Sequence, residues 1–585
     1  MTVAIYNQEV INTDDKVVNH QQQSSLSPPF FYPEASLDDV IKKAQFEATE
    51  AKKNPHTFKK SIQRVAVIGA GPSGLPTAKA LKEHGLEVKI FERMGEVGGN
   101  WVYSEESPLT PSIPSDNNPA PRSKQDVLEK QKKEDGILME ANHKERMSHA
   151  PSTACYAGLH NNTAAPIMLN YEDFPWPEDT PWYISHTRVH QYFKDYANEY
   201  GLYDLVELNT NVEFVERKQQ STEEEEEKEE GWELTVRKRE EFDNGMVRYK
   251  SWTESFDAVV MASGGFHRPQ VPEFKHLREY NEQWPERIIH SKQYRRHTDF
   301  VGKNVLIVGG NASGVDIAFH LEGTAKNVYM VIRNEIDPSI EQSTVGLLLR
   351  SMIPDNVIRK RGIVAFSNLN GDVDGSITFN DGTVVNDIDT VIFATGFITD
   401  FEYFGPLQAV RRNQEQQQQQ QEKTKENGDA TEEPLVISNG RRVLNTYQEV
   451  FLIRDPTLAF VGVPGHIINT AFFYYQAQAV ARVWSGSAFL PSQQKMQEYV
   501  DSTTLYPSFP DDVNLQSGIL HSQRFVTWLN DHANYIVNNK SNEEGKKKEL
   551  YTLKGIDPNL NAKWVEIRES WPQRSLDVKK ALKEI

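Results

Sequence analysis

Two segments of the chain combine a short apolar run, a glycine-rich turn and the start of a helix, and this repeated pattern constrains the fold more than any other feature. The segments read VAVIGAGPSGLPTA at 65–78 and VLIVGGNASGVDIA at 305–318. In units of this kind the glycines permit a tight turn and a close approach of the backbone to a pyrophosphate, which lies at the positive end of the helix. Two such units predict that one chain binds two dinucleotides.

The first loop, at 69–74, has a complete GxGxxG pattern. Gly69 permits the turn, Gly71 permits the approach of the pyrophosphate, and Gly74 permits close packing of the helix on the strand. The next apolar run ends at Glu92. A carboxylate at that position accepts hydrogen bonds from ribose hydroxyls and would repel a 2′-phosphate. The first loop therefore favours FAD or NAD.

The second loop, at 309–314, departs from the pattern because Asn311 stands at its middle glycine position. Asparagine tolerates left-handed backbone better than most residues, and Gly310 adds freedom, so we expect the turn to be retained. The apolar run that follows, NVYMVIRN, contains Arg333 at its end instead of an acid. An arginine there suits the 2′-phosphate of NADPH. The alternative interpretation of Arg333 is a solvated arginine at a strand end.

Composition and the order of the apolar runs favour a globular α/β protein. The 585 residues are 38% hydrophobic and 25% charged, which is typical of a globular enzyme. Strand-like and helix-like segments alternate, and this alternation predicts a mostly parallel sheet. The predicted strands lie at 64–69, 87–92, 257–262, 304–309, 328–333 and 390–394, and the predicted helices at 36–52, 73–84, 187–200, 313–322 and 475–485. An acidic run at 221–231 lies between two strand-like segments and predicts a hairpin loop.

The cysteine count excludes one class of flavoprotein. Cys155 is the only cysteine, so no disulfide can form within the chain, and a reducing compartment is expected. A disulfide reductase needs a redox-active cysteine pair and is therefore excluded. No ligand spacing typical of haem or an iron–sulfur cluster is found, and no metal is predicted.

Charge and hydropathy patterning bear on partners and location. The net charge is −19 and no basic stripe is present, so we expect no nucleic-acid partner. The N-terminus has no signal-peptide pattern, and no run of 18 apolar residues occurs. We therefore expect a cytoplasmic protein without a transmembrane segment, with peripheral association with the endoplasmic reticulum as the alternative.

Further motifs, in order along the chain, resemble those of the flavin-containing monooxygenases, in particular the fungal thiol-oxidising and plant S-oxygenating members. After VAVIGAGPSGL come FERMGEVGGNW, YEDFPWPEDTPWYISHTRVHQYFKDYA, WPERIIHSKQYR, VIFATGF, DPTLAFVGVPG and QAQAVARVWSGSAFLPS. The segment WPERIIHSKQYR departs from the identifying pattern of the family, because Trp284 and Glu286 replace a phenylalanine and a glycine. His290, Tyr294 and Arg295 are in place. The resemblance covers about 62–500 apart from the insertions.

The resemblance implies an α/β fold with two Rossmann-like dinucleotide-binding domains, in which the NADPH domain is inserted into a split FAD domain. The expected divisions are a polar, largely disordered extension at 1–61, the first part of the FAD domain at 62–267 with inserts near 105–150 and 221–231, the NADPH domain at 268–385, the second part of the FAD domain at 386–500 with a disordered glutamine-rich insert at 413–433, and a C-terminal helical extension at 501–585.

The activity that the resemblance implies is a monooxygenation that uses NADPH and O2. NADPH reduces FAD, oxygen forms a C4a-hydroperoxyflavin, and a soft nucleophile, either the sulfur of a thiol or sulfide or a nitrogen, takes up one oxygen atom. The activation of oxygen is carried out by the cofactor. Alternatives are a Baeyer–Villiger or N-hydroxylating flavoprotein monooxygenase, and a non-catalytic NADPH-binding flavoprotein.

The resemblance also assigns site residues and partners. Asn162, in GLHNNTA, matches a family asparagine beside the flavin and is the predicted catalytic residue, with Asn161 as the alternative register. His290 is interpreted mainly as a residue that positions the linker or NADPH. The predicted cofactor-binding residues are Gly69, Gly71, Pro72, Ser73, Gly74, Glu92, Arg93, Gly99, Trp101, Asn161, His290, Ser291, Gly309, Gly310, Asn311, Ser313, Gly314, Arg333, Gly396 and Gln476. The expected partners are a small sulfur- or nitrogen-containing substrate and molecular oxygen, with a homodimer as an open alternative.

Overall fold

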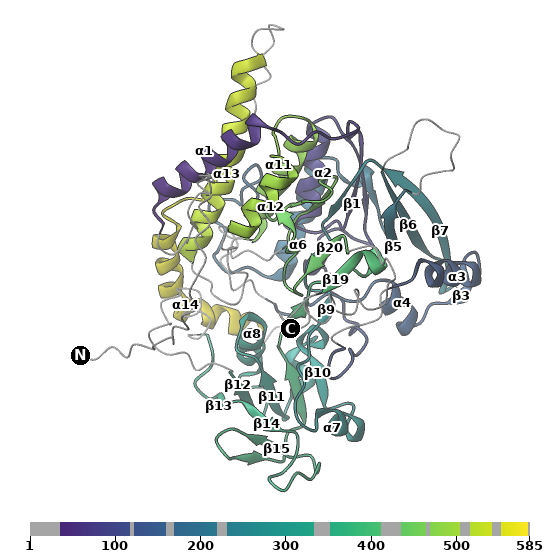
Figure 1. Cartoon of the computed structure of the whole chain (residues 1–585). Coiled ribbons are helices and arrows are strands. Elements are labelled where there is room, and N and C mark those ends of the chain that lie inside the picture. Colours follow the sequence, from purple (N-terminus) through teal and green to yellow (C-terminus); the bar gives the residue numbers. More distant parts are fainter. Residues whose placement is uncertain are drawn as a thin grey trace, which may run out of the picture.

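The structure is a computed structural model that describes residues 35–116, 122–159, 169–218, 231–332, 352–410, 434–463, 469–502, 515–540 and 552–582 (Figure 1). The predicted disordered insert at 413–433 and nearly all of the acidic run at 221–231 lie outside these ranges. Within the described ranges, no helix is both long and apolar enough to cross a membrane.

The first sheet has seven strands in the order β21-β22-β23-β8-β1-β2-β4. Its centre is parallel: β1 (Arg64–Ile68) pairs with β2 (Glu87–Phe91) on one side and with β8 (Ala258–Met261) on the other. The remaining strands of this sheet are β4 (Val206–Glu207), β21 (Thr446–Tyr447), β22 (Phe451–Leu452) and β23 (Leu458–Phe460). Strands from two distant parts of the chain therefore build one sheet.

The second sheet has five parallel strands in the order β10-β17-β11-β12-β13. They are β10 (Ile288–His290), β11 (Asn304–Val308), β12 (Asn327–Val331), β13 (Ile358–Lys360) and β17 (Thr390–Phe393). All five fall between strands of the first sheet in sequence, so the second unit is inserted into the first, as the fold class predicted. The second sheet also runs past the expected boundary at residue 385, because β17 lies between β10 and β11 and shares their hydrogen bonds.

Burial of the parallel strands explains why they are almost continuously apolar in sequence. All five residues of β11 are buried, and so are four of the five in β1, as expected where helices cover both faces of a sheet. The helix α2 (Gly74–Glu83) follows β1 and packs against α11 (Asn469–Trp484), while α8 (Ala312–Leu321) follows β11. The helix α6 (His186–Glu199) contributes buried aromatic side chains to the same core.

A four-stranded antiparallel sheet is attached to the first unit, in the order β3-β7-β6-β5. The strands β5 (Thr210–Arg217) and β6 (Trp232–Glu241) pair across the acidic run, so the predicted hairpin is confirmed by its two flanks. The third and longest strand, β7 (Met246–Phe256), was not predicted. The expected insert near 105–150 contributes β3 (Met139–Glu140) and the helices α3 (Lys124–Glu134) and α4 (His143–His149).

Capping and ion pairs order that insert, which the sequence analysis took for an insertion or a loop. Ser123 and Asn142 cap the two helices through hydrogen bonds to the backbone N–H groups of Gln125 and Glu145. The Glu145 carboxylate also accepts two hydrogen bonds from the Arg239 guanidinium, at 2.8 and 3.1 Å. Helix caps within the insert and an ion pair to β6 thus compensate for the scarcity of apolar residues.

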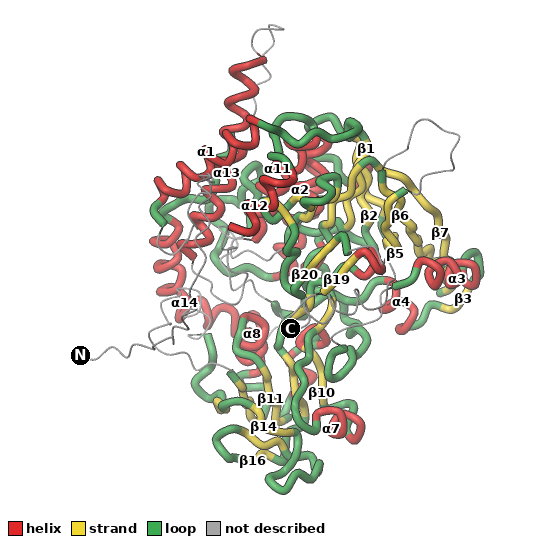
Figure 2. Tube along the Cα trace, in the orientation of Figure 1, coloured by secondary structure: helices red, strands yellow, loops and turns green. Residues whose placement is uncertain are grey.

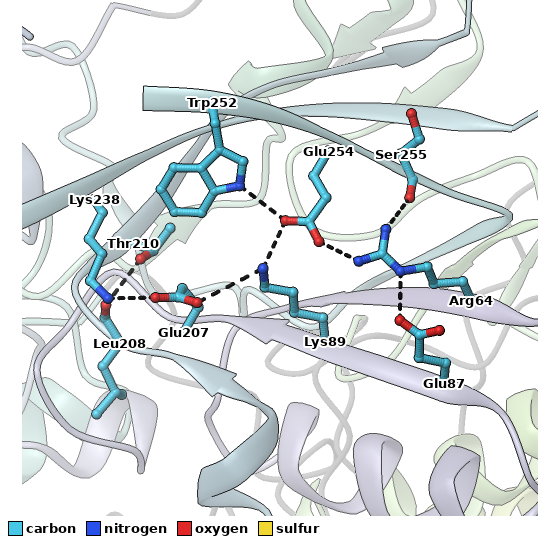
Figure 3. A network of polar contacts seen from close by, with 10 residues as sticks. All are labelled: Arg64, Glu87, Lys89, Glu207, Leu208, Thr210, Lys238, Trp252, Glu254 and Ser255. Atoms are coloured by element: carbon cyan, nitrogen blue, oxygen red, sulfur yellow. Dashed lines mark hydrogen bonds and ion pairs between the residues drawn. The ribbon is translucent and has the colours of Figure 1, made fainter. Parts of the chain in front are cut away.

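An ion-pair network joins the first sheet to the antiparallel sheet (Figure 3). Lys89 on β2 contacts Glu254 on β7 at 2.8 Å and Glu207 on β4 at 3.9 Å. Arg64, at the start of β1, pairs with Glu87 at 2.7 Å and also with Glu254. The network is partly exposed and holds the two sheets together where β1 begins, whereas the first glycine loop follows the other end of that strand.

Helices from both ends of the chain line the same side of the molecule (Figure 2). The helix α1 (Leu37–Lys53), close to the predicted 36–52, packs along α13 (Leu515–Lys540), with Lys52 and Asp531 2.6 Å apart. The helix α14 (Leu560–Leu582) continues toward α8 of the second unit. The other elements are α7 (Leu277–Gln283), α12 (Gln493–Ser502), β9 (Arg268–Pro269), β14 (Ile363–Ala365), β15 (Ile377–Phe379), β16 (Val384–Val385), β18 (Phe397–Ile398), β19 (Gln408–Val410) and β20 (Val436–Ser438).

Candidate active site

The first glycine loop connects β1 to α2. Its first and last residues, Gly69 and Gly74, have no room for a side chain. Gly69 has a φ of +106°, and a Cβ atom there would lie 2.6 Å from the carbonyl oxygen of Ala262 at the end of β8. A Cβ atom on Gly74 would overlap the carbonyl oxygen of Gly69. The outer two glycines of the pattern therefore allow the strand, the turn and the helix to pack closely, as predicted.

The middle glycine of this loop faces a second glycine from another motif. A Cβ atom on Gly71 would lie 3.3 Å from the Cα atom of Gly99, and Gly99 itself has a φ of +55°. Gly99 begins a short 3₁₀ helix that includes Trp101, whose half-buried ring packs on the main core. The two backbones pack directly against each other, so neither residue has room for a side chain, and this part of the loop is lined by backbone, as a pyrophosphate-binding loop requires.

Glu92 directly follows β2, at the position where a carboxylate that binds the ribose hydroxyls is expected. Its carboxylate is buried and accepts hydrogen bonds from the backbone N–H groups of Ala70 and Met94, both at 2.8 Å. Burial raises its pKa, and these hydrogen bonds act in the opposite direction. Each oxygen keeps a lone pair for a further donor. The next residue, Arg93, donates to Nδ1 of His267 at 3.2 Å.

Gln476 contacts Gly462, and Gly462 in turn lies against Ser73 of the first loop. The Gln476 side chain is fully buried, and its Oε1 atom accepts a hydrogen bond from the backbone N–H of Gly462 at 3.0 Å. A Cβ atom on Gly462 would lie 3.0 Å from that of Ser73. Among the described residues, the Nε2 atom of Gln476 has no hydrogen-bond partner. A buried donor without a partner is costly, so this atom fits a ligand that supplies an acceptor.

Two residues beside the first loop were missed by the sequence analysis. The Tyr171 hydroxyl donates to the carbonyl oxygen of Pro72 at 2.6 Å, and Gly462 packs on Ser73. Both belong to motifs that the sequence analysis quoted, YEDFPWP and AFVGVPG. The motifs therefore gave a signal that these residues matter. The contact of Tyr171 with the loop could not be predicted, because it joins residues 99 positions apart and depends on tertiary structure.

The second glycine loop repeats the geometry of the first at its ends. Gly309 has a φ of +119° and lies against the carbonyl oxygen of Ala394, while a Cβ atom on Gly314 would overlap the carbonyl oxygen of Gly309. A Cβ atom on Gly310 would lie 2.8 Å from the Ile332 side chain. The Ser313 residue is in the first turn of α8.

Asn311 does not have the left-handed backbone that we expected. Its φ and ψ are −96° and −176°, and its Oδ1 atom accepts a hydrogen bond from the backbone N–H of Ala312 at 2.9 Å. The residue is the N-cap of α8, a position that asparagine favours. The turn is retained because the left-handed residue is Gly309, and Asn311 adds a cap.

His290 is the last residue of β10 in the second unit, and its side chain contacts the segment that follows β17. The imidazole is fully buried: Nδ1 accepts from the backbone N–H of Lys292 at 3.1 Å, and Nε2 donates to the carbonyl oxygen of Gly396 at 3.0 Å. Burial lowers the pKa of His290 to about 4. Both ring nitrogens are used within the chain, which agrees with a positioning role and not with direct cofactor contact. Ser291 follows as a buried residue, and Gly396 has a φ of +84°.

Three predicted site residues lie outside the described residues: Asn161, Asn162 and Arg333. The other predicted residues gather at two loops and the connection between them. Cys155 is fully buried, and burial raises the pKa of its thiol to about 12, so the thiol is protonated and unreactive at neutral pH.

The residues present fit two dinucleotides. The first loop offers a side-chain-free cradle, a carboxylate at the strand end and an unpartnered buried amide donor, and the second offers a capped helix behind a left-handed glycine. Both loops follow central strands of parallel sheets, where ligands of such sheets bind. These features define an oxidoreductase that binds a flavin dinucleotide and a nicotinamide dinucleotide on one chain.

Comparison with known proteins narrows this class. Residues 135–336 match the model of the flavin-binding monooxygenase-like family, residues 67–113 match an NAD(P)-binding Rossmann-like domain, and residues 247–428 match a pyridine nucleotide-disulphide oxidoreductase model. These matches, together with curated relatives named flavin-containing monooxygenases, agree with the family that the sequence motifs indicated. The predicted fold class, and FAD and NADPH as cofactors, are confirmed by the same comparisons.

Relatives and solved structures share most of the chain length. Flavin-containing monooxygenase iboF of Amanita muscaria is 29% identical over 88% of this chain and 95% of its own length. Senecionine N-oxygenase of Tyria jacobaeae is 28% identical over 74% of this chain and 74% of its own length. The structure of S-allyl-L-cysteine S-oxygenase from Allium sativum is 22% identical, covers 90% of this chain, and has a TM-score of 0.52.

Proposed function

We propose that this chain catalyses the NADPH- and O2-dependent transfer of one oxygen atom to a soft nucleophile, either the sulfur of a thiol or sulfide or a nitrogen. One observation carries the proposal: two glycine cradles, one of them backed by the Glu92 carboxylate, occur on a chain with a single cysteine. Because no cysteine pair is available to receive electrons from the flavin, molecular oxygen is the acceptor that we propose.

The chain contributes binding, orientation and exclusion of water. FAD, when bound and reduced by NADPH, supplies the activation of O2. The Tyr171 hydroxyl holds the Pro72 carbonyl on one side of the first loop, and Gly462 lies against Ser73 on another. The Gln476 amide presents its free Nε2–H group from a fully buried side chain. A donor held in a dry site orients a bound cofactor more strongly than the same group in water.

Two residues outside the described ranges belong to the proposal by their positions in sequence. Asn162, in GLHNNTA, supplies an amide near the flavin. Arg333, at the end of the strand after the second loop, holds the 2′-phosphate and so selects NADPH over NADH. Support for a soft nucleophile comes from the resemblance to S-oxygenating members and from a relative named senecionine N-oxygenase. A cytoplasmic location, supported by the single cysteine, and a homodimer stay proposals.

The experiment that tests this function compares three substrates. The purified FAD-loaded protein is mixed with NADPH, O2 and either a thioether, a tertiary amine or a cyclic ketone, and NADPH oxidation, peroxide release and product are measured together. We expect S-oxide or N-oxide in near-stoichiometric amounts with NADPH consumed. Lactone from the ketone alone would favour a Baeyer–Villiger enzyme. Failure to retain FAD, or a retained flavin that NADPH does not reduce, would favour a non-catalytic NADPH-binding protein.

A further inference from the structure

A hydrogen bond between Tyr156 and Asp316 crosses from the first unit to the second. The Tyr156 hydroxyl donates to the Asp316 carboxyl. Tyr156 belongs to a loop of the first unit, whereas Asp316 lies on α8, the helix that begins at the second glycine loop. Both side chains are 5% exposed. The contact therefore joins the helix behind the second nucleotide site directly to the first unit.

The surroundings of this pair are aromatic. The Tyr156 ring meets the ring of Tyr294 edge-on at 5.0 Å and that of His320 edge-on at 5.3 Å. Tyr294 in turn stacks on Phe300 at 5.4 Å. The titratable groups beside the pair are thus Tyr294, from the segment between β10 and β11, and His320, one turn after Asp316 on α8. Burial alone raises the pKa of Asp316 to about 8, and no charged group contributes.

The backbone on both sides of Tyr156 is fixed by the segment between β10 and β11 of the second unit. The Arg295 guanidinium donates to the carbonyl oxygen of Cys155 at 2.8 Å and to that of Thr153 at 2.9 Å. The carbonyl oxygen of Arg295 accepts from the backbone N–H of Ala157 at 2.8 Å. A buried guanidinium that holds carbonyl groups from two residues leaves the segment little freedom.

The same segment is fixed to the first nucleotide site. The Oδ1 atom of Asn100, next to Gly99, accepts a hydrogen bond from the backbone N–H of Ala154 at 3.1 Å. The Thr153 hydroxyl donates to the carbonyl oxygen of Val102 at 2.7 Å. Residues 153–157 consequently contact the segment beside the first site, the segment between β10 and β11 of the second unit, and α8 behind the second site.

We propose that the Tyr156–Asp316 hydrogen bond is a latch that fixes α8, and with it the second glycine loop, at the distance from the first loop that hydride transfer requires. Tyr156 and Asp316 are positioning residues: they act through α8 and touch neither cofactor. The inference rests on the proposed function, because it assumes that NADPH on the second loop reduces a flavin on the first.

The chemistry of the pair makes the latch depend on pH. At neutral pH the Asp316 carboxyl is protonated, so the pair is uncharged and is held by a neutral hydrogen bond. As pH rises through about 8, the carboxyl becomes a buried anion without a cation beside it, a state that burial disfavours. Relief requires water to enter, which separates α8 from Tyr156. We expect flavin reduction to slow above this pH.

The experiment is anaerobic reduction of the FAD-loaded protein by NADPH in a stopped-flow instrument, from pH 6 to 9.5, without O2 or substrate. In Tyr156→Phe at pH 7 we expect the limiting rate of flavin bleaching to fall about tenfold, the effect of one buried hydrogen bond, while the apparent Kd of NADPH changes less than about threefold. Tyr294→Phe is the matched control, since its hydroxyl has no hydrogen-bond partner among the described residues, and it should reduce as fast as wild type.

Two variants at Asp316 keep the test decisive if Tyr156→Phe does not fold. Asp316→Asn keeps an acceptor for the Tyr156 hydroxyl but cannot ionise, so its rate should stay constant above pH 8 where the wild-type rate falls. Asp316→Leu removes the acceptor and should be slow at every pH. Identical pH profiles for wild type and Asp316→Asn would overturn the latch. A wild-type flavin that NADPH does not reduce would instead contradict the proposed function.

Discussion

Gly71 and Gly99 pack directly against each other at the first glycine loop. A Cβ atom on Gly71 would lie 3.3 Å from the Cα atom of Gly99, and a Cβ atom on Gly99 would lie 2.9 Å from the Cα atom of Gly71. The two residues come from different motifs, the loop after β1 and the 3₁₀ helix after β2. Their close approach leaves no room for a side chain on either residue, so the packing of the 3₁₀ helix against the loop depends on both glycines.

Gly99→Ala should therefore lose FAD. The added methyl group displaces backbone on both sides of the cradle, because its nearest neighbour is the backbone of Gly71 and not a flexible side chain. The flavin absorbance per mole of purified protein should drop to a small fraction of the wild-type value. Gly85→Ala is the control: it also has left-handed backbone, with a φ of +82°, but no atom within 4 Å. Equal flavin content in Gly99→Ala and wild type would contradict the cradle.

Gly314→Ala should weaken the second nucleotide site and leave the first intact. Its methyl group would overlap the carbonyl oxygen of Gly309 and so force α8 away from β11. We expect this variant to retain FAD and to lose at least about tenfold in NADPH affinity, measured by isothermal titration calorimetry or flavin reduction. Gly74→Ala has the equivalent overlap in the first loop. This variant should lose FAD and keep its affinity for NADPH. Loss of FAD from Gly314→Ala would show that the sites are not independent.

Gln476→Leu should be less stable than wild type even without cofactor. The substitution leaves the partly buried backbone N–H of Gly462 without its acceptor, at a cost of about 1 kcal/mol. Urea unfolding of the FAD-free protein measures this loss. Gln478→Leu, two residues along α11 and also buried, is a control for the exchange of an amide for an apolar side chain. Equal losses in both variants would argue against a specific role of the Gly462 contact.

Buried neutral histidines should make the fold sensitive to acid. Burial lowers the pKa of His290 to about 4, and that of an unfolded histidine is about 6.5. Between these values the unfolded chain binds a proton that the folded chain does not, so stability is full above pH 6.5 and falls as pH drops toward 4. His290 contributes at most about 1.4 kcal/mol per pH unit. Urea unfolding from pH 7 to 4.5 should show a smaller slope in His290→Asn than in wild type, and parallel slopes would assign the effect to other groups.

The C-terminal helix should stabilise the protein through packing more than through charge. Trp571 on α14 lies 5.0 Å from the Tyr183 ring of the first unit and 5.6 Å from the Phe319 ring on α8. Trp571→Ala should cost about 3–5 kcal/mol. Lys579 pairs with Glu322 at 2.6 Å, but both are about a third exposed, so Lys579→Ala should cost less than about 1 kcal/mol. Chemical unfolding that ranks the two variants in the opposite order would refute this assignment.

Local patterns predicted most of the parallel units. The strand after Gln63 and the strand after Lys303 begin within a residue of their expected positions, because continuous apolar runs bounded by glycine turns have few other solutions. The cap formed by Asn311 is also a local contact and could have been predicted from the preference of asparagine for that position.

Contacts between distant segments could not be predicted in the same way. The place of β17 in the second sheet follows from pairing with Val305–Val308, and the Tyr156–Asp316 hydrogen bond joins residues 160 positions apart. Within 105–150, Glu145 on α4 pairs with Arg239 on β6, 94 positions further along the chain. Such partners are chosen by tertiary packing, which overrides the polar composition that indicated an insertion or a surface loop.

The central claim is that one oxygen atom of O2 reaches a soft nucleophile at the expense of NADPH. The most direct test is mass spectrometry of the product formed from a thioether under ¹⁸O2 in unlabelled water, with NADPH consumption measured in the same sample. The account predicts one ¹⁸O atom in each sulfoxide molecule and close to one NADPH per product. A sulfoxide that carries ¹⁶O from water, or NADPH consumption that yields only peroxide, would contradict it.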